Sequence, residues 1–276
     1  MENYHKIDDL GVGTFGKVSL YIDKTTQQKV CIKEIVHTHK NTTQIQNEVL
    51  ILAMFNHPNI IQYYNSFLNQ HGHLCIVMEY AVHGTLHDYL LRQKRFIPQQ
   101  YVLYIFAQIL MAIDYIHAQN VVHRDLKAEN VMITGGAASV IKLTDFGISK
   151  ILLNVDNNKT GTLIGTPNYL APEICRGEKY GIKADIWALG CILYELCALE
   201  RMFDGPMATI ILAITNCEIK KINTNIYRKA IQDWIAIMCH SDPNQRPNAS
   251  CLLRNPIILP QMLSIQVNLG KVLARH

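Results

Sequence analysis

Hydrophobic and polar residues alternate in two neighbouring segments near the start of the chain. In "KVSLYID", residues 17–23, Val18, Leu20 and Ile22 occupy every second position, which is the period of a β-strand. A turn-like "KTTQQK" leads into "VCIKEIV", residues 30–36, which we interpret as a second strand. The pattern predicts a β-hairpin.

Further along the chain the hydrophobic period becomes helical. In residues 42–60, Ile45, Val49 and Leu52 form the apolar stripe of an amphipathic helix. Residues 99–119 are a longer helical stretch, and residues 185–199 are apolar on most faces, as expected of a central buried helix. The order is therefore short strands first and helices afterwards.

A glycine-rich segment, "GVGTFGKV" at residues 11–18, lies directly before the first of these strands. Its spacing fits or nearly fits a dinucleotide-binding loop, a P-loop and the glycine-rich loop of protein kinases. The first two must open a helix, whereas a strand follows here, and a P-loop also needs Ser or Thr where Val18 stands. The remaining interpretations are the kinase loop, in which Val18 covers the nucleotide base, and a hairpin without a ligand.

Composition narrows the class of protein. The chain has 276 residues, 49% of them hydrophobic and 17% charged, as in a globular protein of one large domain or two lobes. The net charge of +4 includes no basic run, so nucleic acid is not implied. Eight cysteines without a C-x-x-C pair indicate a reducing compartment. We expect neither a signal peptide nor a membrane span, since the richest apolar run, residues 101–113, contains Gln108.

Four further motifs follow the glycine-rich segment in a fixed order. They are "VCIK" ending at Lys33, a helical glutamate at Glu48, "HRDLKAEN" at residues 123–130, and "DFG" followed by "APE" at residues 145–147 and 171–173. Individually a strand lysine or a helical glutamate is usually a surface charge. Together, in this order, they favour phosphoryl transfer over a ligand-free hairpin.

On these motifs the chain resembles the eukaryotic protein kinases over essentially its whole length. Lys127 and the run "GTPNYLAPE" are similar to the Ser/Thr branch, and "HPNIIQYYNSFL", "DFGISKIL" and "ADIWALGCILYEL" resemble the NIMA-related kinases. The greatest likeness is to members whose kinase domain precedes a propeller of chromosome-condensation-regulator repeats. The resemblance implies an α+β fold in one kinase domain, residues 1–276. Its small, mainly β N-lobe is expected at 1–78, a hinge at 79–81 and a mainly α C-lobe at 82–276.

The resemblance also implies the site residues. ATP would be bound by Leu10, Gly11, Val12, Gly13, Phe15, Gly16, Val18, Cys31, Lys33, Glu48, Met78, Glu79, Ala81 and Met132. Asp125, Lys127 and Thr166 would act on the substrate hydroxyl and the γ-phosphate, and Asn130 and Asp145 would hold Mg²⁺. Asp185 and the pair Glu173–Arg246 are expected to be structural. No motif residue of a working kinase is missing, which argues against a binding-only pseudokinase.

Three hypotheses concern control and selectivity. Thr162, with Thr160 as the rival, is the expected activating phosphorylation site, and Arg124 its phosphate partner. Cys31 could have a lowered thiol pKa because it shares a strand face with Lys33, or it could be an ordinary packing residue. Glu129 could attract a basic residue upstream of the target hydroxyl, or be an exposed glutamate without a partner.

Partners and location follow from the resemblance. We expect protein substrates bearing Ser or Thr, with ATP and Mg²⁺, a regulatory domain or subunit outside this chain as a further partner, and no nucleic acid or membrane. A cytoplasmic location is expected, with centrosome, spindle or cilium as alternatives that rest on the family alone. The tail from residue 258 either docks on the helical lobe or leads into another domain.

Overall fold

The computed structural model describes residues 2–13, 16–35, 49, 52–135, 139–145, 167–179 and 181–273. The chain divides into two compact units, one containing the residues up to Val82 and the other the described residues from His83 onward. The first is built on a β-sheet and the second on helices, which is the two-lobed protein kinase fold expected from the sequence.

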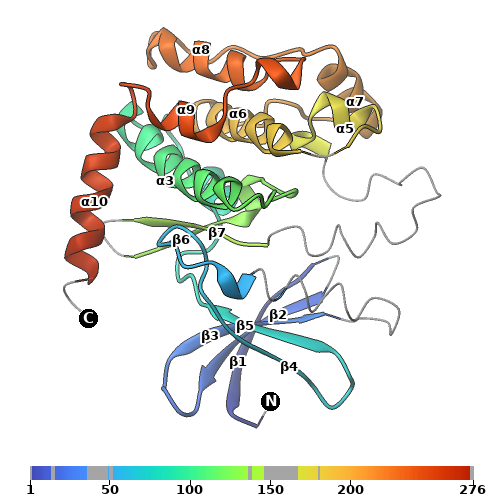
Figure 1. Ribbon diagram of the computed structural model, residues 1–276, viewed down its shortest axis with the longest axis vertical. Coiled ribbons are helices and arrows are strands. Elements are labelled where there is room, and N and C mark those ends of the chain that lie inside the picture. The colour runs from blue at the N-terminus through green and yellow to red at the C-terminus, as the bar shows by residue number, and fades with distance from the viewer. Residues whose placement is uncertain are drawn as a thin grey trace. The chain divides into compact units, whose positions relative to one another are not determined.

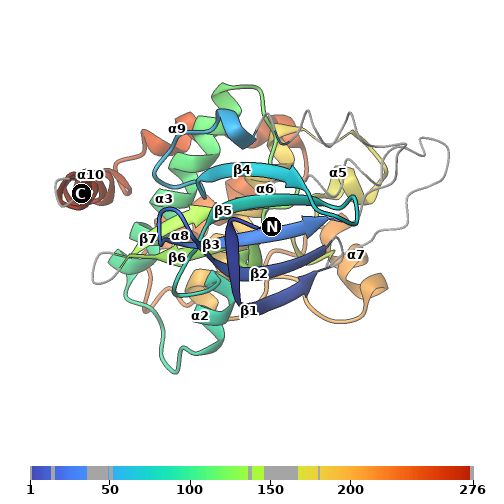
Figure 2. The same cartoon turned by 90° about the horizontal axis from the view of Figure 1, so that it is seen from below.

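The first unit is a five-stranded antiparallel sheet in the order β1-β2-β3-β5-β4 (Figure 2). Its strands are β1 (Tyr4–Gly13), β2 (Gly16–Asp23), β3 (Lys29–Ile35), β4 (Tyr63–Leu68) and β5 (Leu74–Glu79). Both faces of the sheet carry buried side chains. One face is lined by Tyr21, Val30, Ile32, Cys75 and Val77, and the other by Ile35, Leu74 and Ile76 with Val49 packed on them.

The second unit begins with the helices α2 (Leu86–Leu91) and α3 (Gln99–Ala118). A short 3-10 turn, η2 (Ala128–Asn130), leads into a two-stranded hairpin, β6 (Val131–Thr134) and β7 (Val140–Leu143). The remaining elements are η3 (Pro167–Tyr169), α5 (Pro172–Cys175), α6 (Ile182–Ala198), α7 (Met207–Thr215), α8 (Lys229–Met238), η4 (Pro243–Gln245), α9 (Ala249–Leu253) and α10 (Leu259–Leu273).

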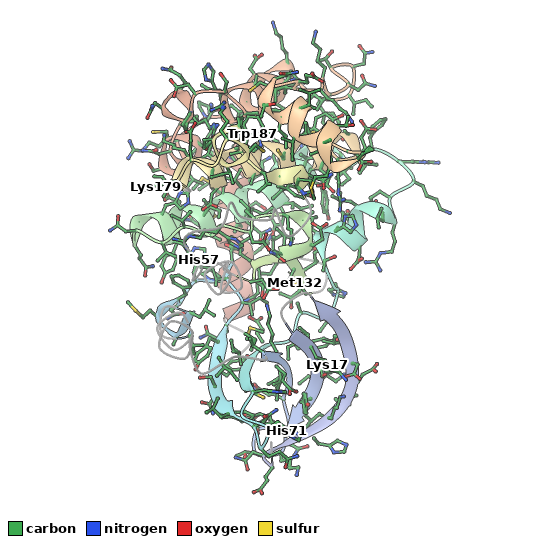
Figure 3. The ribbon with its side chains drawn as sticks, turned by 90° about the vertical axis from the view of Figure 1, so that its right-hand side faces the viewer. Lys17, His57, His71, Met132, Lys179 and Trp187 are labelled. Carbon is green, nitrogen blue, oxygen red and sulfur yellow. The ribbon has the colours of Figure 1, made fainter. Side chains whose placement is uncertain are left out.

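Helix α6 is the centre of this unit, as its apolar sequence predicts. It packs between α3 and α8 (Figure 1). Trp187, which Figure 3 labels among the helices, is fully buried and stacks on Phe203 with ring centroids 5.9 Å apart. A side chain at Gly190 would place its Cβ 2.5 Å from the Cys239 sulfur, so only glycine lets α6 and the end of α8 approach this closely.

Helix α3 is long and apolar enough, by length and composition, to cross a membrane, but most of it is buried inside the fold. Gln108, which interrupts the apolar run in the sequence, is a buried hydrogen-bonding residue of α3. Gln108 is 1% exposed, and its amide accepts from Ile141 N at 3.0 Å and donates to Ser139 O at 3.3 Å. These hydrogen bonds join α3 to β7 and the residue before it, so α3 is a core helix against which the β6–β7 hairpin packs.

The tail forms the helix α10, which packs against α3. This agrees with the expectation that the tail docks on the helical lobe. Ile265 is fully buried in this contact, while Leu259, Leu263 and Val267 are exposed on the helix.

Candidate active site

The glycine-rich segment forms the end of β1 and the start of β2. Gly11 pairs with Val18 and Gly13 with Gly16, so the two strands turn back on each other around residues 14 and 15, which lie outside the described part. No helix follows within residues 16–35, which confirms the hairpin and excludes the dinucleotide and P-loop alternatives. A Cβ at Gly16 would lie 2.0 Å from the carbonyl oxygen of Glu34. Only glycine allows this contact between the hairpin and β3.

The strand register brings several predicted ATP-binding side chains to one face of the sheet. Val18 pairs with Lys33, and Cys31 pairs with Met78, and directly paired residues of antiparallel strands point to the same side. Ile35, two residues beyond Lys33, packs with Val49 on this face. The predicted helix of Glu48 thus adjoins the face that carries Lys33, although Glu48 itself lies outside the described residues.

Cys31 differs from the hypothesis of a reactive thiol. Its place beside Lys33 on the strand is as predicted, but burial raises the pKa of the Cys31 thiol to about 11. A buried thiol resists ionisation because the thiolate loses its hydration. The structure therefore supports the interpretation of Cys31 as a packing residue, and the prediction of a lowered thiol pKa is wrong.

The predicted hinge begins where β5 ends. The backbone N–H of Glu79 donates to Gln62 O at 2.9 Å, and Gln62 N donates to the Glu79 carboxylate at 3.1 Å, so this strand end is held from both sides. Ala81 follows and is 5% exposed. Leu10, by contrast, is exposed and lies at a register shift of β1 between Asp9 and Gly11.

In the second unit the predicted catalytic residues meet around one carboxylate. The Lys127 ammonium lies 2.9 Å from Oδ2 of Asp125, and the Asn130 amide donates to the same oxygen at 2.9 Å. Asn130 also donates to the backbone oxygen of Asp125 at 2.7 Å. The sequence predicted Asp125 and Lys127 as catalytic residues and Asn130 as a metal ligand, and the structure brings these three residues together.

Asp185 fixes the backbone of this loop, as expected. Its fully buried carboxylate accepts the N–H of His123 at 2.8 Å and that of Arg124 at 3.1 Å, and it lies 2.9 Å from His117 Nε2. The side chain stands in the first turn of α6, where the helix dipole favours a negative charge. His123 is also fully buried, and burial lowers the pKa of its imidazole.

The β6–β7 hairpin brings the two predicted metal ligands to its open end. Asn130 precedes β6, Asp145 follows β7, and the N–H of Thr144 donates to Asn130 O at 3.0 Å. Met132 lies on β6 paired with Lys142, and is labelled in Figure 3. Arg124 and Asp145 adopt left-handed backbone conformations, with φ of 67° and 57°. Such conformations cost roughly 1–3 kcal/mol in non-glycine residues and concentrate at functional sites.

This arrangement suits a small divalent cation. Because the Asn130 amide nitrogen donates hydrogen bonds to Asp125, the amide oxygen is the atom that can face a metal, and Asp145, which follows β7, would supply a carboxylate. Within the described residues no three His, Cys, Asp or Glu side chains form a metal-binding group. A magnesium ion needs no such group, because it keeps several waters and binds one or two protein oxygens together with substrate phosphates.

Glu129 does not match either alternative from the sequence. Its carboxylate is only partly exposed and is already paired, because Arg201 donates to Oε1 at 2.6 Å. Arg201 follows α6, 72 residues later in the chain, and no local pattern singled it out. Sequence reasoning therefore missed it.

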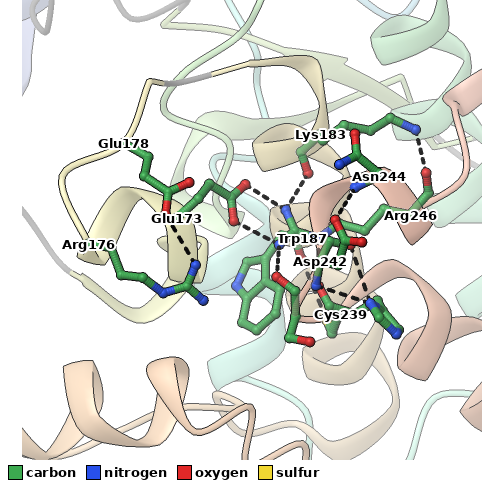
Figure 4. Close-up of polar contacts among 11 residues, drawn as sticks. Glu173, Arg176, Glu178, Lys183, Trp187, Cys239, Asp242, Asn244 and Arg246 are labelled. Carbon is green, nitrogen blue, oxygen red and sulfur yellow. Dashed lines mark hydrogen bonds and ion pairs between the residues drawn. The ribbon is translucent and has the colours of Figure 1, made fainter.

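The scaffold pair Glu173–Arg246 is confirmed (Figure 4). Arg246 is 1% exposed, and its guanidinium donates to both carboxylate oxygens of Glu173, at 2.7 and 2.8 Å. It also donates to the carbonyls of Lys183 and His240, and lies over the Trp187 ring at 5.1 Å.

Several predicted residues fall outside the described part of the chain. They are Phe15, Glu48, Thr160, Thr162 and Thr166, together with the side chain of Val12. Their roles remain predictions.

Comparison with known proteins settles the family. The sequence profile of the protein kinase domain matches residues 4–258, and this range contains every motif described above. The chain belongs to the protein kinase family. This kinase is 39% identical to the serine/threonine-protein kinase nekl-2 of Caenorhabditis elegans, across 99% of its own length and 79% of that of nekl-2.

Two vertebrate relatives are considerably longer than this kinase. It is 38% identical to Nek8 of Danio rerio over 100% of its own length, but spans 40% of Nek8. It is 36% identical to Nek9 of Mus musculus over 93% of its own length, and spans 26% of Nek9. These relatives are serine/threonine-protein kinases of the Nek group, so the chain is a Ser/Thr kinase domain of NIMA-related type, and its family uses ATP with a divalent metal.

Proposed function

We propose that this kinase transfers the γ-phosphate of MgATP to Ser and Thr hydroxyls of protein substrates. The observation that carries the proposal is the cluster of Asp125, Lys127 and Asn130 around one carboxylate oxygen. Asp125 is the acceptor that orients the substrate hydroxyl and takes up its proton. Lys127, 2.9 Å away, brings a positive charge to the place where the transferred phosphate gains negative charge.

The residues of each unit have separate tasks in this mechanism. Bound MgATP supplies the activated phosphoryl group and a metal that neutralises its charge. The backbone at Gly11, Gly13 and Gly16 covers the phosphates, and Lys33 pairs with them. In the first unit, Val18 and Cys31 would contact the base, and Met78 would gate the pocket behind it. In the second unit, Met132 would contact the base, and Asn130 and Asp145 would provide the metal oxygens.

We predict a strict magnesium requirement. Excess chelator should abolish ATP consumption with a generic Ser/Thr protein substrate, and Mg²⁺ should restore it, whereas Ca²⁺ should restore little because it favours more ligands and longer bonds than this site offers. The measurement is phosphoprotein formed per unit time during metal titration. Full activity in chelator, or no activity on any Ser/Thr protein with Mg²⁺ present, would contradict the proposal.

We also propose that phosphorylation of Thr162 switches the kinase on. Arg124 supports this, because its backbone is held by Asp185 next to Asp125, and a guanidinium there can bind phosphate in a bidentate manner. A phosphate carries a charge of about −1.5 to −2 and would order the segment around this cation. Thr160 is the rival acceptor.

Phosphatase treatment should therefore lower the activity of the autophosphorylated kinase by about tenfold or more, the worth of one charge-assisted hydrogen bond. Thr162→Ala should have this low activity before and after phosphatase, and Thr160→Ala, the matched control, should behave like the parent. Initial rates on one peptide decide the matter. If Thr162→Ala were fully active, or the parent insensitive to phosphatase, the switch would not exist.

Two broader proposals rest on family likeness. The amino-acid sequence between the motifs supports a place among the NIMA-related kinases whose catalytic domain precedes a propeller. The propeller would then be a regulatory domain outside this chain. The same likeness supports a cytoplasmic location, with centrosome, spindle or cilium as the alternatives. The mass of the endogenous protein tests the first, and imaging of the tagged protein tests the second.

A further inference from the structure

An ion pair inside the second unit covers an acidic residue of the catalytic loop. Glu129 lies between Lys127 and Asn130, the residues that handle the phosphate and the metal in the proposed function. Its Oε1 accepts from Arg201 Nη2 at 2.6 Å, and the two side chains are 28% and 24% exposed. The pair thus stands at the surface of the loop that receives the substrate, partly open to solvent.

A second carboxylate lies within electrostatic range of the same guanidinium. Glu195 on α6 is 3% exposed, and the Tyr169 hydroxyl donates to it. The backbone of Ala128, next to Glu129, also hydrogen-bonds this hydroxyl. Burial raises the pKa of Glu195, and the negative charge of Glu129 raises it further, whereas Arg201 lowers it. Glu129 and Glu195 therefore both interact with Arg201. His87 Nδ1 lies 3.8 Å from Oε1, the other oxygen of the Glu195 carboxylate.

Arg201 is held in place by its backbone. The chain leaves α6 through Leu199, whose φ is 59°, and Lys220 then donates to Arg201 O at 3.1 Å. Lys220 also lies 3.3 Å from the Glu200 carboxylate, which accepts from the Tyr194 hydroxyl at 2.8 Å. The backbone that carries the guanidinium is thus anchored at Glu200 and at the Arg201 carbonyl.

We propose that Arg201 is a specificity-determining residue: from within the chain it occupies the position beside Glu129 that a basic residue of a protein substrate would otherwise fill. This inference rests on the proposed function, because it assumes that a peptide binds along the catalytic loop. Selectivity is a difference in affinity between alternative substrates. A kinase that neutralises its own acids gains nothing from a basic substrate residue there, and accepts neutral peptides equally well.

The test compares peptide preference between variants. A set of peptides with one Ser is used, in which each flanking position carries in turn Ala, Arg or Glu, and kcat/KM is measured for each peptide. The parent should show an Arg-to-Ala ratio near one at every position upstream of the Ser. Arg201→Gln should raise this ratio about tenfold at one upstream position, because a carboxylate freed of its partner gains a charge-assisted hydrogen bond from the peptide. Arg201→Lys keeps the positive charge and should keep the parent ratio.

A reciprocal variant makes the test independent of how well Arg201→Gln folds. Glu129→Gln leaves Arg201 with a free positive charge, so the Glu-to-Ala ratio should rise several-fold at the position where Arg201→Gln favours Arg. The double variant Glu129→Gln, Arg201→Gln should lose the gained preference for Arg. An active parent whose ratios do not change in either single variant would overturn this inference alone, as would a parent that already prefers Arg tenfold. A parent inactive on every peptide would overturn the proposed function with it.

Discussion

Replacing Asp125 with asparagine should lower the phosphorylation rate by a factor of about 10²–10⁴, the usual worth of a positioned acid–base group. Asparagine has the same shape and can still lie against Lys127 and Asn130, which contact the carboxylate at 2.9 Å. It cannot take up a proton from the substrate hydroxyl. Initial rates on a Ser peptide measure the loss, and the affinity for a fluorescent nucleotide should remain nearly that of the parent.

Two further variants serve as controls for the effect of Asp125→Asn. Asp204→Asn makes the same chemical change at an exposed position outside the site and should leave the rate unchanged. Lys33→Met should instead weaken nucleotide binding, because its side chain belongs to the phosphate-binding set. Equal rates for Asp125→Asn and the parent would refute the mechanism assigned to Asp125.

Replacing Arg246 with alanine should lower the free energy of unfolding of the helical unit by about 3–5 kcal/mol, the cost of leaving a buried charge without its partner. The bidentate contacts with Glu173, at 2.7 and 2.8 Å, are almost completely buried. The same change also removes bonds to the carbonyls of Lys183 and His240 and the contact with Trp187. Urea unfolding followed by tryptophan fluorescence gives the difference, because Trp187 reports on this region.

The chain provides a matched control for this prediction. Arg176 also pairs with a glutamate, Glu178 at 3.4 Å, but their side chains are 44% and 53% exposed. Exposed pairs of this kind contribute about 0–1 kcal/mol. Arg176→Ala should therefore unfold at nearly the urea concentration of the parent. If Arg246→Ala were no less stable than Arg176→Ala, burial would not be what makes the Glu173 pair important.

Features that depend on a few neighbouring residues could be predicted from the sequence. The two-residue period at Val18, Leu20 and Ile22 identified β2, and the strand that follows the glycines excluded two of the three phosphate-binding loops. The spacing of Asp125 and Asn130 matched the catalytic loop of protein kinases, and the family resemblance supplied the role of Lys127 between them. The structural roles of Asp185 and Arg246 were predicted from the family resemblance, because the contacts of these residues are long-range and no local sequence pattern indicates them.

Features that depend on tertiary neighbours could not be predicted. The partner of Glu129 is 72 residues away, and only the path of the chain after α6 brings Arg201 to it. For Cys31, the strand period correctly placed the thiol beside Lys33 but contains no information about burial, which dominates its pKa. Both errors have the same cause: a charge or a thiol was judged by its neighbours in sequence rather than by what the fold packs around it.

The carboxylate of Asp185 makes the catalytic loop depend on chain that lies 62 residues beyond His123. A fragment ending before α6 would contain Asp125, Lys127, Asn130 and Asp145, yet it would lack the group that holds the loop backbone. Residues 176–179, all exposed, lie between the two parts and offer a place to divide the chain. Halves separated there and fused to two interacting proteins would make a split enzyme, in which phosphate transfer reports that the fused proteins have met.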